Sequence, residues 1–163
     1  MQVFTAQPED FPAWLCLAAE VEPLFGPMVN DPGFHRALRK NIERGTAFCI
    51  RKGDAAPGGM LLGGILFSQK PPLYNIGWLA VTRSSRRCGI GRLLVEHVIS
   101  LVQSPAEITV TTFGPDVAEG QPARRFYESM GFQPSEPAPH GPEGGSRQIY
   151  RRSCSTAIKD KVG

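Results

Sequence analysis

The chain has 163 residues, and its apolar, charged and aromatic fractions are ordinary for one globular domain with a substantial core. No apolar run approaches the ~20 residues that a membrane-spanning helix needs, and the first residues lack the pattern of a signal peptide. The formal net charge of +3 is too small to indicate a nucleic-acid partner, so we expect a cytoplasmic protein that binds neither nucleic acid nor a membrane.

The first half of the sequence predicts a strand, two helices and a hairpin of two strands. The strands are expected over residues 2–5, 46–51 and 60–67, and the last two should pair antiparallel. Asp10 is expected to cap the first helix and Pro23 to end it, while Asp31 and Gly45 mark the ends of the second helix. Residues 24–30, between the helices, form a turn-rich loop with bulky apolar residues, which suits the lining of a site.

The second half predicts two strand–helix units and a final pair of strands. Strands are expected over residues 74–81, 107–113, 132–135 and 147–152, and helices from Ile90 to before Pro105 and from Pro122 to Gly131. Residues 136–146 read as a loop and residues 153–163 as a frayed tail. The strands on either side of the first of these helices should run parallel. This order predicts an α/β fold with one mixed sheet of about seven strands, helices on both faces, and a single domain over residues 1–152.

A loop rich in arginine and glycine connects the strand at 74–81 to the next helix. Its arginines are Arg83, Arg86, Arg87 and Arg92, and its glycines are Gly89 and Gly91. Unpaired N–H groups and the helix dipole attract anions at such a junction, and glycine allows close approach to the main chain. We therefore expect a phosphate-bearing ligand. Arg92 and Leu93 after Gly91 exclude a P-loop, and Leu94 replaces the third glycine of a dinucleotide fingerprint.

The remaining pattern, Arg86-x-x-Gly89-x-Gly91 after a buried strand, resembles motif A of the GNAT superfamily of acyl-CoA-dependent N-acetyltransferases. Residues 123–132 resemble the family's second signature, a helix that carries a tyrosine, here Tyr127, and ends in Gly-Phe. The element order is also similar, so the resemblance covers essentially residues 1–152 and implies a GNAT-like fold. One departure is Gly120, where many relatives carry an asparagine that contacts CoA.

The resemblance implies acetyl-CoA as co-substrate and indicates which residues bind it. The pyrophosphate would lie on backbone N–H groups of Arg87, Cys88, Gly89, Ile90, Gly91 and Arg92, with the Arg86 side chain assisting. The pantetheine arm would run along Leu79, Ala80 and Val81, and an N–H near Leu79 would polarise the thioester carbonyl. Tyr127 would contact the CoA and protonate its departing thiolate, while simple packing on the helix face is the alternative interpretation.

The sequence is less specific about the acceptor side. Glu20 and Glu22 lie beside the loop 24–30, where either could bind a cationic amine or act as a base through water, and a solvated helix end is the alternative for each. His35 is expected at the surface and His97 at the boundary of the core. The cysteines fit neither a metal site nor a nucleophile setting, so we expect unpaired thiols at Cys16, Cys49, Cys88 and Cys154.

Together these observations favour an N-acetyltransferase that moves an acetyl group from acetyl-CoA to a primary amine by direct attack. A small-molecule amine is the first expectation for the acceptor, and a protein N-terminus or lysine is the second. A non-catalytic acyl-CoA-binding sensor is the alternative from a different class of function. Relatives often dimerise, so a homodimer is considered as well.

Overall fold

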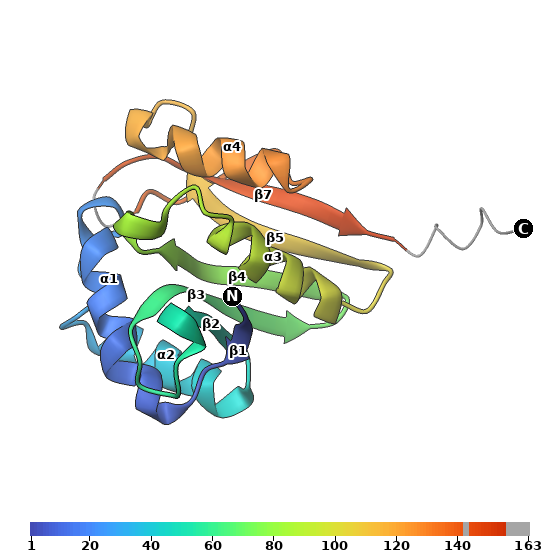
Figure 1. Cartoon of the computed structure of the whole chain (residues 1–163). Coiled ribbons are helices and arrows are strands. Elements are labelled where there is room, and N and C mark those ends of the chain that lie inside the picture. Colours follow the sequence, from blue (N-terminus) through green and yellow to red (C-terminus); the bar gives the residue numbers. More distant parts are fainter. Residues whose placement is uncertain (142–143, 156–163) are drawn as a thin grey trace, which may run out of the picture. The chain divides into compact units, whose positions relative to one another are not determined.

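The computed structural model describes residues 1–141 and 144–155. Its strands and helices follow one another in the predicted order (Figure 1). In chain order they are β1 (Val3–Thr5), α1 (Phe11–Phe25), α2 (Pro32–Arg44), β2 (Ala47–Arg51), β3 (Leu61–Lys70), β4 (Leu73–Val81), α3 (Ile90–Leu101), β5 (Ala106–Phe113), α4 (Gln121–Ser129), β6 (Gln133–Ala138) and β7 (Arg147–Cys154). Within the described residues, no helix is both long enough and apolar enough to cross a membrane.

The seven strands join one sheet in the order β1-β2-β3-β4-β5-β7-β6. β4 pairs with β5 in parallel, from Leu73 opposite Glu107 to Ile76 opposite Val110. The pairs β1–β2, β2–β3, β5–β7 and β6–β7 are antiparallel. The parallel pair is joined through α3, because parallel neighbours need a crossover connection. The predicted α/β fold with one mixed sheet is therefore confirmed.

The chain divides into two compact units. The first comprises Met1–Phe67 and Gly77–Val98, and the second comprises Ser68–Ile76 and Ile99–Gly163. Strands β3 and β4 and helix α3 contribute residues to both units. The single domain expected over residues 1–152 stays a prediction.

In the first unit, helices pack on both faces of the sheet. Ala47 and Cys49 of β2 lie in a buried apolar cluster with α1 and α2, represented by Trp14 and Leu38. Phe48 points to the opposite face, because successive side chains of a strand alternate. Its ring meets His97 of α3 at 4.6 Å between centroids, so α3 covers that face.

Two adjacent glycines of β3 let these helices approach the strand closely. A Cβ at Gly63 would lie 2.6 Å from Cγ2 of Ile90 in α3, and one at Gly64 would lie 2.8 Å from the indole of Trp14 in α1. Both distances are too short for real carbon–carbon contacts. A side chain at either position would therefore push a helix away from the sheet.

Asp10 does not cap α1 with its side chain, contrary to the prediction. Its carboxylate is fully buried and accepts hydrogen bonds from Arg51 Nε at 2.9 Å and Arg51 Nη2 at 2.7 Å. The backbone N–H groups of Gln7 and Gly58 donate to the same carboxylate. The residue was misinterpreted because its partner is 41 positions away in the sequence.

The helix boundaries differ from the prediction at one proline. α1 continues through Pro23 to Phe25, and the Gly26 N–H donates to the Glu22 carbonyl at 2.8 Å. A proline removes one hydrogen bond, but the next turn re-forms here, so Pro23 does not end the helix. The predicted ends of α2 are confirmed: Asp31 Oδ2 accepts from the Phe34 N–H at 3.0 Å, and Gly45 is left-handed with φ +72°.

The second unit contains the sheet edge formed by β5, β7 and β6. β6 extends to Ala138, although residues 136–138 were predicted to be loop, and β7 extends to Cys154, two residues beyond the prediction. Ser153 and Cys154, predicted to belong to the frayed tail, therefore belong to a strand. Residues 156–163 of that tail lie outside the described residues.

Candidate functional site

The loop between β4 and α3 is anchored at its first residue. Thr82 is buried, and its N–H donates to the Leu62 carbonyl of β3 at 2.8 Å. The Thr82 carbonyl accepts from the Ser85 N–H at 3.0 Å, which closes the short 3₁₀ turn Arg83–Ser85. The loop therefore leaves the sheet in a fixed direction.

Two residues of this loop adopt left-handed backbone conformations just before α3. Arg87 has φ +66° and Gly89 has φ +82°. A positive φ is uncommon for a residue with a side chain, and such conformations gather at functional sites. A Cβ at Gly89 would meet nothing within 4 Å, so the backbone there is open to a ligand. The first N–H groups of α3, which begins at Ile90, have no acceptor within their own helix.

The loop carries positive charge that the protein only partly compensates. All four arginines, Arg83, Arg86, Arg87 and Arg92, are exposed. Arg92 forms an exposed pair with Glu96 at 3.8 Å, and Arg86 Nε reaches the Val81 carbonyl at 3.5 Å. Among residues 1–141 and 144–155, no carboxylate pairs with the side chain of Arg83 or Arg87. This combination of open backbone and free guanidinium groups is chemically suited to a phosphorylated ligand.

The strand that leads into this loop pairs with β5 over only part of its length. The register between β4 and β5 ends at Ile76, so residues 77–81 of β4 lie outside this parallel ladder. Leu79 and Val81 are half-buried, and Ala80 is in the apolar core. Unpaired strand backbone can accept an extended ligand arm as an added strand.

Glu20 of α1 is joined to the start of the same loop. Its Oε2 accepts from the Thr82 hydroxyl at 2.9 Å, and its Oε1 accepts from the Arg83 N–H at 2.9 Å. Glu20 is half-buried. The carboxylate is thus a structural partner of the arginine-rich loop, and the interpretation of a merely solvated helix end does not describe it.

Glu22 holds a different loop. Its Oε2 accepts from the backbone N–H groups of Met28 at 2.7 Å and Val29 at 2.8 Å. These two hydrogen bonds, from Val29 and then Met28, lower the pKa of Glu22. Glu22 therefore carries negative charge at neutral pH and fixes the loop between α1 and α2.

His35 holds the same loop from the other side. Its Nε2 donates to the Val29 carbonyl, since a carbonyl can only accept, and its ring lies edge-on to Phe11 at 5.4 Å. His35 is half-buried, so the expectation of a purely surface histidine was wrong. No sequence pattern pointed to it, because its partner lies in an irregular loop.

An aromatic cluster adjoins this loop. The Trp78 Nε1–H donates to the Met28 sulfur at 3.2 Å, and the Trp78 ring lies 5.8 Å from that of Phe34. Trp78 and Phe34 are only half-buried, although both pack on the apolar core. They offer apolar surface beside the loop that Glu22 and His35 hold.

Tyr127 belongs to the second unit. It is buried, and its ring packs against Phe126 at 5.2 Å and Phe132 at 5.6 Å between centroids. Burial raises the pKa of Tyr127 well above its ordinary value, so the phenol stays protonated. None of the described residues forms a hydrogen bond with the Tyr127 hydroxyl, and its oxygen is not completely enclosed by the protein. The hydroxyl is therefore free to donate to a ligand.

Gly120 cannot be replaced by a residue with a side chain in this arrangement. A Cβ there would overlap the Phe113 side chain. An asparagine at this position is therefore incompatible with the packing of Phe113 beside the start of α4.

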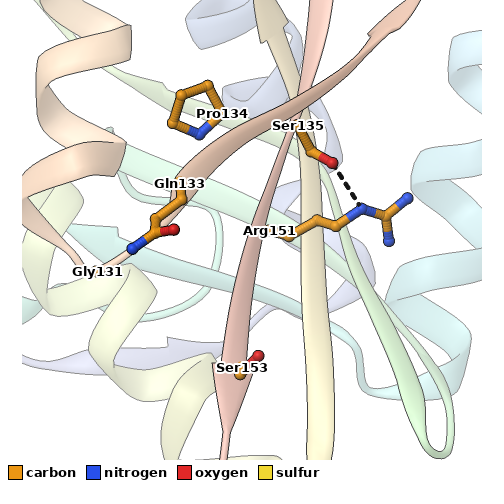
Figure 2. Close-up of a pocket in the computed structure, with 6 residues that line it drawn as sticks. All are labelled: Gly131, Gln133, Pro134, Ser135, Arg151 and Ser153. Carbon is orange, nitrogen blue, oxygen red and sulfur yellow. Dashed lines mark hydrogen bonds between the residues drawn. The ribbon is translucent and has the colours of Figure 1, made fainter.

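A cavity of about 390 Å³ opens on the second unit (Figure 2). Its lining residues come from the end of α4, from β6 and from β7: Gly131, Gln133, Pro134, Ser135, Arg151 and Ser153. The cation in this cavity, Arg151, is already neutralised by Glu107 and Glu136, each at 2.5 Å. Because those carboxylates outnumber the arginine, the cavity is a poor site for phosphate.

The thiols and histidines do not form a metal site in the described part of the chain. All four cysteines are unpaired, as predicted; Cys16 and Cys88 are exposed, and Cys49 and Cys154 are buried. Burial raises the pKa of Cys49 to about 12, with the charge of Asp10 adding to the effect. Cys49 is therefore an inert core thiol.

Comparisons with known proteins agree with this geometry. A family model described as an acetyltransferase (GNAT) domain matches residues 43–134, more than half of the chain. A search of curated protein sequences found no match.

Solved structures with the same fold include several acetyltransferases. A putative GNAT-family acetyltransferase from Desulfovibrio desulfuricans aligns with a TM-score of 0.67 and 21% identity over 93% of this chain and 99% of its own. PaiA N-acetyltransferase from Thermoplasma acidophilum, in complex with coenzyme A, gives 0.71 and 13% over 94% and 98%. Naa50 from Arabidopsis thaliana, in complex with the bisubstrate analogue CoA-Ac-MVNAL, gives 0.71 and 17% over 94% and 98%.

Proposed function

Since the chain belongs to the GNAT family of acetyltransferases, we propose that it transfers the acetyl group of acetyl-CoA to a primary amine, in the first place that of a small molecule. As a family member it is an acyltransferase, and acetyl-CoA is its co-substrate. The amine nitrogen attacks the thioester carbon, a C–N bond forms, the C–S bond breaks, and CoA leaves as the thiol. The amine loses one proton and the CoA sulfur gains one.

The loop between β4 and α3 is the observation that carries this proposal. Its open backbone at Gly89, its exposed arginines and the start of α3 suit the pyrophosphate of CoA. The binding residues proposed are Arg86 with its side chain, and the backbone N–H groups of Arg87, Cys88, Gly89, Ile90, Gly91 and Arg92. These groups supply charge-assisted hydrogen bonds, which are stronger than neutral ones.

The second half of β4 is proposed to hold the pantetheine arm. Residues 77–81 lie outside the ladder with β5, so the main chain from Leu79 through Ala80 to Val81 is proposed to offer a ligand the groups on its β5 side. The Leu79 N–H is proposed to polarise the thioester carbonyl, because a fixed donor stabilises the negative charge that develops on that oxygen.

Tyr127 is proposed to assist the leaving group. A phenol whose pKa burial has raised is a weak acid, so it serves the departing sulfur as a hydrogen-bond donor before it transfers a proton. The absence of a hydrogen bond from its hydroxyl to any described residue supports this role.

The acceptor amine is proposed to meet the loop between α1 and α2. Met28 and Val29 of this loop are held by Glu22, whose charge also favours a cationic amine nearby. An amine must be neutral to attack, and because the Glu22 carboxylate is engaged by backbone donors of this loop, water that Glu22 orients is the proposed route for the proton.

A peptide N-terminus is the second candidate acceptor, and one observation favours it. Trp78 and Phe34 present half-buried apolar surface beside the loop between α1 and α2, and this surface suits a peptide whose first residue has an apolar side chain. Naa50 from Arabidopsis thaliana, which shares the fold, was solved with an analogue that joins CoA to a peptide beginning with methionine.

Steady-state thiol release separates these candidates. The purified chain is mixed with acetyl-CoA and a panel of small amines and of peptides with free N-termini or lysines. Amine-dependent thiol release supports the enzyme, and the preferred panel members identify the acceptor class. Tight acetyl-CoA binding without turnover across the panel would favour an acyl-CoA sensor instead.

A further inference from the structure

We propose that Glu20 is a positioning residue for acyl-CoA: its carboxylate sets the direction in which the chain leaves β4, and thereby places the arginine-rich loop. The inference rests on the proposed function of that loop. It differs from a role as general base, in which Glu20 would take the proton of the amine directly or through water.

The contacts of Thr82 fix the geometry. Its N–H is bonded to β3, its carbonyl closes the turn at Ser85, and its hydroxyl is bonded to Glu20. The next N–H along the chain, that of Arg83, also donates to Glu20. Two consecutive residues at the exit of the strand are thus tied to α1 by one side chain. The positions of Thr82 and Arg83 therefore set the direction of the open segment that follows, residues 86–89.

The electrostatics argue against an accidental contact. A carboxylate beside an anion site opposes phosphate binding, because like charges repel. Here the carboxylate oxygens accept from a hydroxyl and a backbone N–H, and none of the arginine side chains in the described part of the chain donates a hydrogen bond to them. The guanidinium groups of Arg83 and Arg87 therefore stay available, and the benefit of Glu20 is geometric.

Glu22 is a matched control on the same helix. It is also a glutamate with two hydrogen bonds from protein donors, but it holds Met28 and Val29 of the other loop. Two residues are about 200° apart around an α-helix, so Glu20 and Glu22 point to different sides of α1. Truncating either one removes the same side chain and a comparable number of hydrogen bonds.

Calorimetric titration of the full chain with acetyl-CoA tests the inference. Glu20→Ala is expected to weaken acetyl-CoA binding about tenfold, since hydrogen bonds to a charged group are lost. Glu20→Gln, which keeps an oxygen acceptor for the Arg83 N–H, should recover most of the affinity. Glu22→Ala should leave the acetyl-CoA affinity unchanged. Thermal melts of each variant verify folding.

Thr82→Val keeps the test decisive if Glu20→Ala fails to fold. This change is nearly isosteric and removes only the hydroxyl that donates to Glu20. It should weaken acetyl-CoA binding by itself. Where Glu20→Ala does fold, the loss in the double variant should be smaller than the sum of the two single losses, because both changes remove the contact between Thr82 and Glu20.

The outcomes separate this inference from the proposed function. Wild-type protein that binds no acetyl-CoA would overturn both. Wild-type binding with unchanged affinity in folded Glu20→Ala and Thr82→Val would overturn the positioning role alone. A Glu20→Gln variant that binds acetyl-CoA normally but has lost turnover would show that Glu20 is a base and would also overturn it.

Discussion

Replacing Gly89 by leucine should abolish acetyl-CoA binding while the protein remains folded. The added Cβ meets nothing within 4 Å, so the cost in the folded state is the left-handed backbone alone, about 1–2 kcal/mol for a residue with a side chain. That cost is small beside a typical domain stability of about 5–15 kcal/mol. If the side chain displaces two hydrogen bonds to the pyrophosphate, about 3–6 kcal/mol of binding is lost, or roughly 10² to 10⁴ in affinity.

Gly45 provides the matched control for this prediction. It has φ +72° and also has nothing within 4 Å of its missing Cβ, but it lies at the end of α2. Gly45→Leu should lower the melting temperature by about as much as Gly89→Leu and leave acetyl-CoA affinity intact. The assay is calorimetric titration beside thermal melting. Equal acetyl-CoA affinities in the two variants would refute the assignment of the pyrophosphate to the loop at Gly89.

Three further predictions concern single side chains. Tyr127→Phe should lower kcat about 10- to 100-fold with little change in acetyl-CoA affinity or melting temperature, and an unchanged kcat would return Tyr127 to a packing role. Asp10→Ala should cost about 3–5 kcal/mol in urea unfolding, because Arg51 would be left buried and unpaired. Burial alone would raise the pKa of Asp10, but hydrogen bonds from Arg51, Gln7 and Gly58 outweigh it and lower the pKa. The stability that this ion pair contributes is therefore present above about pH 4, near the unfolded pKa, and is lost as the pH falls through the lowered folded pKa. The difference in urea midpoint between the wild type and Asp10→Ala should shrink with it, and a difference that does not change with pH would contradict this contribution. His35→Leu should raise KM for the amine more than it lowers kcat, with partial rescue in His35→Gln, whose amide can donate to Val29; equal KM values would contradict a role in holding the loop.

The elements with local signals were predictable from the sequence. Asp31 and Gly45 delimit α2 through contacts within a few residues of each, and the strand predicted over residues 46–51 is observed at Ala47–Arg51. The arginine and glycine loop was also visible, because anion binding at a helix start depends on consecutive residues.

The misinterpretations have two physical causes: one distant side-chain partner, and contacts to nearby backbone carbonyls. Asp10 was read as a cap because capping is local, whereas its partner Arg51 is brought near by the fold. Pro23 was read as a helix end, although the hydrogen bond from Gly26 to Glu22 continues α1 beyond it. His35 was placed at the surface because the carbonyl that it binds belongs to an irregular loop. A partner 41 residues away leaves no local trace in a sequence, and the contacts that continue α1 past Pro23 and hold His35 use backbone carbonyls, which carry no residue-specific signal.

The last two turns of α1 hold both loops of the first unit that the proposed reaction uses. Glu20 fixes the loop that starts at Thr82, and Glu22 fixes the loop at Met28, so any tilt of this helix end would move both loops together. Because the two loops share one support, acetyl-CoA that orders the first should also restrict the second through α1. The acceptor side would then be best formed when acetyl-CoA is already bound, which predicts that amine affinity rises in its presence. By thermodynamic linkage, a bound amine must tighten acetyl-CoA by the same factor, and equal acetyl-CoA affinity with and without the acceptor would argue against this coupling.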